Sequence, residues 1–171
     1  MPDTPQLLMF MAAGWLLNLT PGPDVLYIVT NALRSGVRAG LVAALGITAG
    51  CFVHIFAAAL GVSALMAASA TAFTVLKWAG ALYLLYAGIQ LLLTKKPSAM
   101  TVVAVSEAAT SAVGLKSIFF RGFWTNALNP KVALFFLAFL PQFIAPETSN
   151  KALVFGLLGV LFNVNALPIN F

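Results

Sequence analysis

Residues 18–24 read Asn-Leu-Thr-Pro-Gly-Pro-Asp and lie inside an apolar run that extends from Leu7 to Val29. Neither proline has a backbone N–H, and each proline ring clashes with the carbonyl group four residues earlier. Gly22, between them, permits backbone dihedral angles that are closed to other residues. The stretch therefore predicts a helix that is broken midway and leaves carbonyl groups without helical partners.

The composition indicates which solvent surrounds this helix. Of the 171 residues, 61% are hydrophobic and 8% are charged, and the mean hydropathy is +1.00, whereas soluble domains carry about 25% charged residues. A soluble domain of this size would leave roughly 30% of its unfolded surface in water, and too few polar residues are present to cover it. The chain is therefore predicted to be an all-α membrane protein, a polytopic helix bundle.

Apolar segments of suitable length recur along the chain. A helix needs about 20 apolar residues to cross the hydrocarbon layer, and four segments have that length: Leu7–Val29, Leu41–Met66, Phe73–Leu93 and Ile118–Leu140. A fifth, Ala152–Leu167, is shorter, and nearby Asn163, Asn165 and Pro168 suit lipid poorly. The first residues lack the basic region of a secretory signal, so we expect the first run to be retained as a span.

A polar stretch from Thr94 to Lys116 divides the chain into two hydrophobic halves. We expect residues 1–93 to form one three-helix unit, residues 94–117 a loop, and residues 118–171 a second, incomplete unit. We expect the loop after the first span to carry Arg34 and Arg38. The central loop region carries Lys95, Lys96, Lys116 and Arg121, and the loops on the opposite side offer only Lys77 and Lys151. This asymmetry predicts a cytoplasmic central loop and a periplasmic N-terminus. The basic residues form no stripe of neighbours, so their pattern does not indicate nucleic-acid binding.

The first and fourth apolar runs resemble each other. Residues 14–25, Gly-Trp-Leu-Leu-Asn-Leu-Thr-Pro-Gly-Pro-Asp-Val, align with residues 122–132, Gly-Phe-Trp-Thr-Asn-Ala-Leu-Asn-Pro-Lys-Val, when Gly22 is treated as an insertion. Glycine, asparagine, proline and valine then coincide. Units of three spans that each begin with a broken helix enter the membrane in opposite directions, so the echo predicts inverted-topology repeats. Chance similarity between apolar segments is the alternative.

Each break is followed by a charge within an apolar run, Asp24 in the first and Lys131 in the second. An isolated charge costs about 3 kcal/mol or more inside a membrane helix, so neither is expected to face lipid. One interpretation makes Asp24 a helix N-cap that forms a structural salt bridge with Lys131. The other has both charges, with the freed backbone groups, receive the carboxylate and ammonium of a zwitterion. A plain proline kink, satisfied by Thr20 or Asn18, is a further alternative.

Other reactive residues give weak signals. Cys51 and His54 share one helix face, but two ligands are fewer than the three that a metal site normally has, so no metal or other cofactor is predicted. His54 is of the residue type that changes charge near neutral pH, and it stays a candidate for proton coupling together with Asp24. No nucleophile elbow, His-Glu-x-x-His motif or carboxylate pair is present, so an enzyme is not expected.

Small residues in the second and third runs, Gly46-x-x-x-Gly50, Gly61, Ala79-Gly80-Ala81 and Gly88, predict close helix packing. Packing within one protomer is favoured over a dimer interface. The proline motifs, together with the glycines of the second run, make the chain similar to the LysE/RhtB family of amino-acid exporters. The resemblance rests on the motif at 18–24, the glycines at 36, 40, 46 and 50, and residues 126–131, Asn-Ala-Leu-Asn-Pro-Lys.

The resemblance implies export of neutral or basic amino acids, homoserine, threonine or homoserine lactones across the bacterial inner membrane, driven by protons through alternating access. The motif positions that it marks as substrate-binding candidates are Asn18, Thr20, Pro21, Gly22, Pro23, Asp24, Asn126, Asn129, Pro130 and Lys131. Family members usually continue to a sixth helix, whereas this sequence stops at Phe171 after about five. A second protomer would then have to supply the missing wall, so a homo-oligomer is a possibility. The alternatives are a non-transporting fragment or scaffold, and an exporter of metal or other ions.

Overall fold

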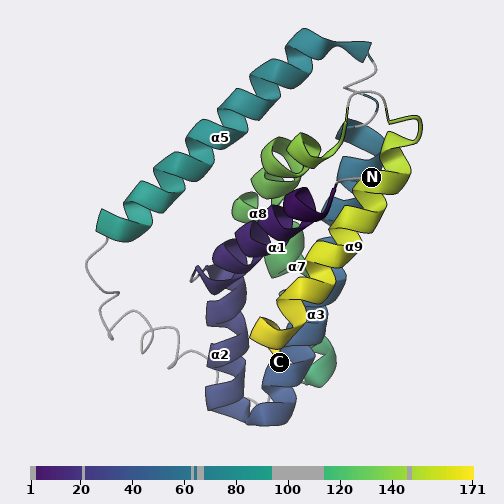
Figure 1. Cartoon of the computed structure of the whole chain (residues 1–171). Helices are drawn as coiled ribbons and strands as arrows, with labels where there is room; N and C mark the ends of the chain where they lie inside the picture. The colour runs from purple at the N-terminus through teal and green to yellow at the C-terminus, as the bar shows by residue number, and fades with distance from the viewer. Residues whose placement is uncertain (1–2, 21, 63, 65–67, 94–113, 146–147) are drawn as a thin grey trace.

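The structure is a computed structural model that describes residues 3–20, 22–62, 64, 68–93, 114–145 and 148–171. Its regular elements are helices, and they form a bundle in which α3 (Val37–Ala57) and α9 (Lys151–Asn170) run side by side while α5 (Ala70–Leu93) lies along one edge (Figure 1). The predicted all-α membrane bundle is confirmed. The predicted loop at 94–117 falls mostly outside the described residues.

The first predicted span is two helices. Helix α1 (Thr4–Leu19) begins at an N-cap, Asp3, whose carboxylate accepts a hydrogen bond from the backbone N–H of Gln6 at 2.8 Å. Helix α2 (Pro23–Ser35) begins with a proline at its first position, where the missing N–H costs nothing. The break therefore occurs within the motif, as the prolines predict.

The turn between α2 and α3 is a single residue, Gly36, with a φ of 83°. This left-handed backbone favours glycine because a side chain would clash there. Arg34 and Arg38 therefore lie in helices on either side of Gly36 and not in a loop, which corrects the sequence-based placement. Helix α3 continues into a π-helical turn, η1 (Ala58–Val62).

The fourth predicted span is also interrupted. Helix α7 (Leu115–Ala127) begins within the stretch predicted as loop, and Leu128 is its C-cap. Helix α8 (Pro130–Leu134) follows and continues as the π-helical η2 (Phe135–Phe139) and the 3-10 helix η3 (Leu140–Phe143). The two parts are bent by 42° relative to each other.

The interruptions coincide with the internal repeat. Helix α1 ends at Leu19 and α7 at Ala127, which are aligned positions, and α2 begins at Pro23 as α8 begins at the aligned Pro130. Each broken helix also packs on the second helix of the other half, because α7 contacts α3 and α1 contacts α9. The same local sequence thus breaks both runs in the same place. The opposite insertion of the two halves stays a prediction.

Glycines allow the closest of these contacts. A Cβ atom added to Gly46 would overlap the carbonyl oxygen of Phe119, and one added to Gly50 would overlap that of Phe123. Helices α3 and α7 therefore approach backbone to backbone, as the small-residue pattern predicts. Gly80 of α5 lies equally close to Ala138 of η2, so α5 is fixed to the bundle by this edge.

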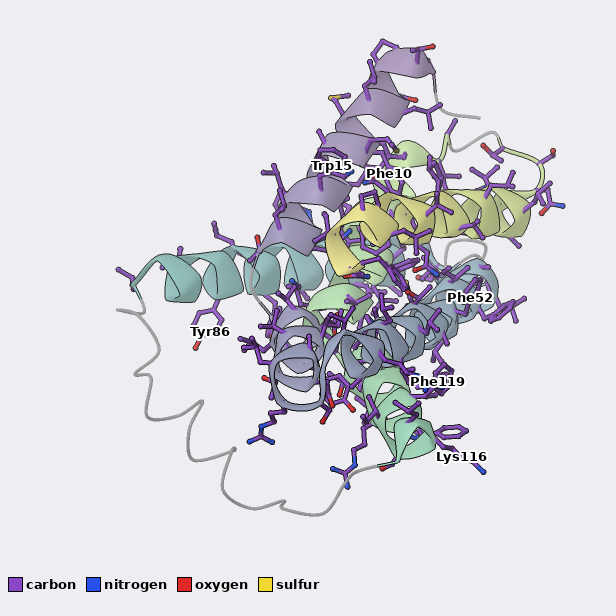
Figure 2. The ribbon with its side chains drawn as sticks, turned by 90° about the horizontal axis from the view of Figure 1, so that it is seen from below. Phe10, Trp15, Phe52, Tyr86, Lys116 and Phe119 are labelled. Atoms are coloured by element: carbon purple, nitrogen blue, oxygen red, sulfur yellow. The ribbon has the colours of Figure 1, made fainter. Side chains whose placement is uncertain are left out.

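The buried core lies between α1, α3, η2 and α9. Its largest members are aromatic: Phe10 meets Phe135 and Phe143 with ring centroids 6.1 and 5.3 Å apart, and Phe135 meets Phe162 at 4.7 Å. Outside this core, apolar side chains point away from the bundle; Figure 2 shows Phe52 and Tyr86 doing so, and Tyr86 is 59% exposed. An outward apolar surface is what lipid contact requires.

Two described helices, Val37–Val62 and Lys151–Asn170, are long and apolar enough to cross a membrane, and the bent pair Leu115–Ala127 with Pro130–Phe143 makes a third if it is one span. Helix α5 covers the range predicted for the third span, and α9 extends the predicted fifth. Pro168 lies inside α9 near its end without terminating it.

Candidate functional site

The first break leaves the last carbonyl groups of α1 without helical donors. The hydroxyl of Thr20 turns back and donates to the carbonyl oxygen of Leu16 at 2.6 Å. The backbone N–H of Thr20 donates to the same oxygen at 3.1 Å. The Leu16 carbonyl therefore keeps its helical donor and gains the Thr20 hydroxyl as a second one, so Thr20 does not satisfy a carbonyl freed by the break. The side chain of Asn18 does not do so either.

Two of the carbonyls at this break are satisfied from the other half of the chain. The ammonium of Lys131, in α8, donates to the carbonyl oxygens of Leu17 at 2.9 Å and Thr20 at 3.0 Å. A cation at a helix C-terminus also interacts favourably with the helix dipole. Gly22 leaves room for this approach, because a Cβ there would lie 3.1 Å from the lysine Nζ.

Polar groups at the second break likewise find a partner in the first half of the chain. Asp24, in the first turn of α2, accepts hydrogen bonds at Oδ2 from the amides of Asn126 at 2.9 Å and Asn129 at 3.0 Å. Asn129 is itself the N-cap of α8, because its Oδ1 accepts from the backbone N–H of Lys131 at 3.0 Å. Each charge therefore binds the break in the opposite run.

The salt bridge considered from the sequence is not formed. Asp24 and Lys131 are both described, and their hydrogen bonds go to amide and carbonyl groups of the opposite breaks and not to each other. Asp24 is also not the N-cap of α2, since Gly22 occupies that position. The two charges remain close enough to act on each other electrostatically while leaving space between them.

A small cavity lies in that space. Its volume is about 20 Å³, room for about one water molecule. The residues that line it are Asn18, Asp24, Val25, Ile47, Cys51, Asn126, Lys131, Val132, Phe162, Asn163, Ala166 and Asn170. They come from both broken helices, α3 and α9, so the cavity is the point where the two halves of the chain meet.

Three of the residues that line this cavity carry polar atoms without partners. Among the described residues, Asn18 Nδ2, Asp24 Oδ1 and Asn126 Oδ1 are buried and form no hydrogen bond. Asn126 is 4% exposed. An unsatisfied buried polar group costs about 1–3 kcal/mol, and native folds keep few of them. Three such atoms belong to residues that line one cavity, so these groups are available to a molecule that enters it.

His54 supports the second break. Its Nε2 lies 2.8 Å from the backbone oxygen of Asn126, near the end of α7, and its ring stacks on Phe136 with centroids 6.0 Å apart. The side chain is 7% exposed. Hydrogen bonding to a carbonyl oxygen requires His54 to carry a proton on Nε2. Within the described residues no group of three or more His, Cys, Asp or Glu side chains could hold a metal ion, so Cys51 and His54 have no third ligand there.

The other candidates shape the breaks without lining the cavity. Thr20 bonds within α1, Pro23 and Pro130 begin α2 and α8, and Asn129 caps α8. Pro21 lies outside the described residues. The assignment of these positions to substrate binding stays a prediction.

Helix α9 contributes polar groups that the sequence interpretation treated only as unsuited to lipid. The amide of Asn163 donates to the carbonyl oxygen of Thr48 in α3 at 3.2 Å. Asn165 donates to the carbonyl oxygen of Met11 at 3.1 Å and accepts from the indole N–H of Trp15, which Figure 2 shows on α1 beside α9. Two asparagines inside an apolar run were the available signal, because buried amides need partners.

The sequence profile of the LysE type translocator matches residues 15–164, which include both breaks and the cavity. The chain belongs to the LysE translocator family. This LysE-family chain is therefore a membrane translocator and not an enzyme, as the motif resemblance implies.

Several relatives of this LysE-family chain are known. A membrane protein of Vibrio cholerae is 34% identical over 155 residues, covering 90% of this chain and 73% of the relative. The homoserine/homoserine lactone efflux protein of Salmonella typhimurium is 32% identical over 143 residues, covering 84% and 66%. The leucine efflux protein of the same species is 30% identical over 156 residues, covering 91% and 71%. No solved structure matches this chain.

Proposed function

We propose that this protein exports amino acids or their close derivatives across the bacterial inner membrane, and that the cavity between the two broken helices is its substrate site. The relatives named for efflux of homoserine, homoserine lactone and leucine support an amino-acid substrate. The observation that carries the proposal is the crossing of charges: Lys131 holds the first break, and Asp24 holds the second.

The crossed contacts suit a site that opens and closes. In this conformation the cavity holds about one water and is too small for an amino acid. Entry of a substrate requires the two broken runs to separate beside the cavity, and there the contacts of Lys131 and Asp24 cross between them. Farther along, the hydroxyl of Tyr27 in α2 also donates to the carbonyl oxygen of Ile118 in α7. A substrate carboxylate competes with the carbonyls for Lys131, and a substrate ammonium competes with the amides for Asp24. Binding thereby loosens the contacts that close the site.

Proton coupling completes the proposal. Asp24 is the one acid among the residues that line the cavity, so it is the group that exchanges a proton for a cationic amine. His54 is the second candidate, because it contacts the Asn126 backbone beside that acid. Antiport follows if the carboxyl carries a proton in one direction and binds substrate ammonium in the other. Orientation with the central loop in the cytoplasm agrees with the basic residues.

Transport into inside-out inner-membrane vesicles tests the proposal. With a proton gradient imposed, radiolabelled leucine, homoserine or threonine should accumulate, and an uncoupler should abolish the accumulation. Vesicles that contain Lys116→Met, a change at an exposed lysine on the outer part of α7, should behave as the wild type (Figure 2). Absence of gradient-dependent accumulation of all three would favour the scaffold alternative.

A further inference from the structure

The cavity between the breaks presents an ordered set of unused hydrogen-bonding groups. We infer that Asn18 and Asn126 select the head group of the substrate: Asn18 Nδ2 donates to a free carboxylate, and Asn126 Oδ1 accepts from a free ammonium. The inference rests on the proposed function and names its substrate class, neutral amino acids with both charged groups intact.

The donor side of the cavity consists of Asn18 and Lys131. Asn18 Nδ2 is buried without a partner, and within the described part of the chain the side chain forms no hydrogen bond at all. Lys131 uses two of its three N–H groups on the carbonyls of Leu17 and Thr20, which leaves one donor. Two donors, one of them cationic, match the two oxygens of a carboxylate.

The acceptor side consists of Asp24 and Asn126. Oδ2 of Asp24 is occupied by two amides, whereas Oδ1 is buried and unpartnered. Asn126 donates through Nδ2 to Asp24, and this bond fixes the amide so that its Oδ1 is left over. An anionic and a neutral acceptor side by side match the N–H groups of an ammonium.

The two asparagines occupy equivalent positions of the internal repeat. Asn18 aligns with Asn126 when the broken helices are superposed by sequence, and each lies in the last turn before its break. The repeat therefore delivers an amide to the cavity from each half, and the cross-contact with Asp24 makes one present an acceptor while the other presents a donor. This difference gives the site a direction along which a zwitterion lies.

The rest of the lining predicts the side chain of the substrate. It is apolar in large part, with Val25, Ile47, Cys51, Val132, Phe162 and Ala166. A basic amino acid would bring a second cation, and the lining offers it no acid besides Asp24. An uncharged side chain avoids that desolvation cost. Leucine and homoserine fit the inference, whereas lysine and arginine do not.

The test replaces Asn18 by leucine, which has a similar shape and no polar atoms. Because replacing an unpartnered buried donor by an apolar group costs no internal hydrogen bond, Asn18→Leu should leave the thermal unfolding midpoint in detergent unchanged or raised. It should also raise the half-saturating concentration of leucine or homoserine about tenfold or more, the effect of losing one hydrogen bond to a charged group. An unfolding midpoint that does not fall, together with weaker binding of the substrate, separates substrate contact from a structural role of Asn18.

The matched control is Thr48→Val. The hydroxyl of Thr48 is likewise buried and unpartnered, but it does not line the cavity. This change should leave both the midpoint and the half-saturating concentration close to the wild type. Competition by the decarboxylated analogue isoamylamine, or 3-aminopropanol for homoserine, adds a second comparison, because Asn18→Leu should not weaken inhibition by a ligand that has no carboxylate.

The outcomes are distinct. If the wild type carries none of leucine, homoserine and threonine, the proposed function fails. If the wild type carries one of them while Asn18→Leu leaves its half-saturating concentration unchanged, Asn18 meets only water and the inference is overturned. A rise that is equal for the amino acid and for its decarboxylated analogue overturns it as well, since the effect then comes from a general distortion. Inhibition by lysine as strong as by leucine contradicts the neutral substrate class.

Discussion

The ammonium of Lys131 lies 2.9 Å from the carbonyl oxygen of Leu17, although 114 residues separate them. The contact places a cation at the end of a helix whose last carbonyls have lost their partners, and it ties the second broken run to the first. Asp24, in the first run, accepts hydrogen bonds from Asn126 and Asn129 in the second. Each break is therefore stabilised by a side chain of the opposite run. Changes that remove these hydrogen bonds should lower stability and transport, whereas a change that removes only the charge should lower transport alone.

Lys131→Met should destabilise the protein. It leaves the carbonyls of Leu17 and Thr20 without their donor in a part-buried place, at a cost of about 2 kcal/mol or more. A lower thermal midpoint in detergent and loss of vesicle transport are expected. Lys116→Met is the control with no change in either. A wild-type midpoint for Lys131→Met would mean that the carbonyls are satisfied without the lysine.

Asp24→Asn should separate charge from structure. The amide oxygen can still accept from Asn126 and Asn129, so the fold and the thermal midpoint are retained. The negative charge is lost, and with it the attraction for a substrate ammonium and the proton that is exchanged. We expect gradient-driven accumulation of amino acid to fall about tenfold or more. Full accumulation in this variant would remove Asp24 from the coupling mechanism.

Gly50→Ala should loosen the contact between α3 and α7. The added Cβ would overlap the carbonyl oxygen of Phe123, a backbone atom that cannot move aside, and overpacking of this kind costs about 1–3 kcal/mol. Gly156→Ala is the matched comparison inside α9, since no atom lies within 4 Å of the new Cβ. It should stabilise the helix by about 0.5–1 kcal/mol. Unfolding in detergent measures both, and equal effects would contradict the packing described here.

His54→Gln and His54→Phe distinguish support from proton transfer. Glutamine can still donate to the carbonyl oxygen of Asn126, whereas phenylalanine keeps only the stacking on Phe136. If His54 only positions the break, the glutamine variant transports with the wild-type pH profile and the phenylalanine variant loses stability. If His54 carries the coupled proton, both variants lose the pH dependence of transport. The pH profile of vesicle uptake decides between the two.

Much of the architecture was predictable from local sequence. The prolines around Gly22, and Pro130 after Asn129, interrupt their helices because proline has no N–H and its ring displaces the preceding turn. Proline alone does not decide the matter, since Pro168 lies inside α9 without ending it. The internal alignment placed both breaks at equivalent positions, and α1 and α7 end accordingly. The exact ends were less predictable: Arg34 and Arg38 were assigned to a loop, since one glycine proved sufficient for the turn.

The sequence by itself determined a membrane protein with two interrupted helices and, after each interruption, one charge of opposite sign that should not face lipid, because these features depend on composition and on neighbouring residues. Only the tertiary structure decided what the charges bind. Lys131 donates to backbone carbonyl oxygens, and Asp24 accepts from side-chain amides. Other polar atoms of the residues that line the shared cavity are left without hydrogen-bond partners. Partner choice depends on distances between segments about 100 residues apart, and a local pattern carries no information about those distances.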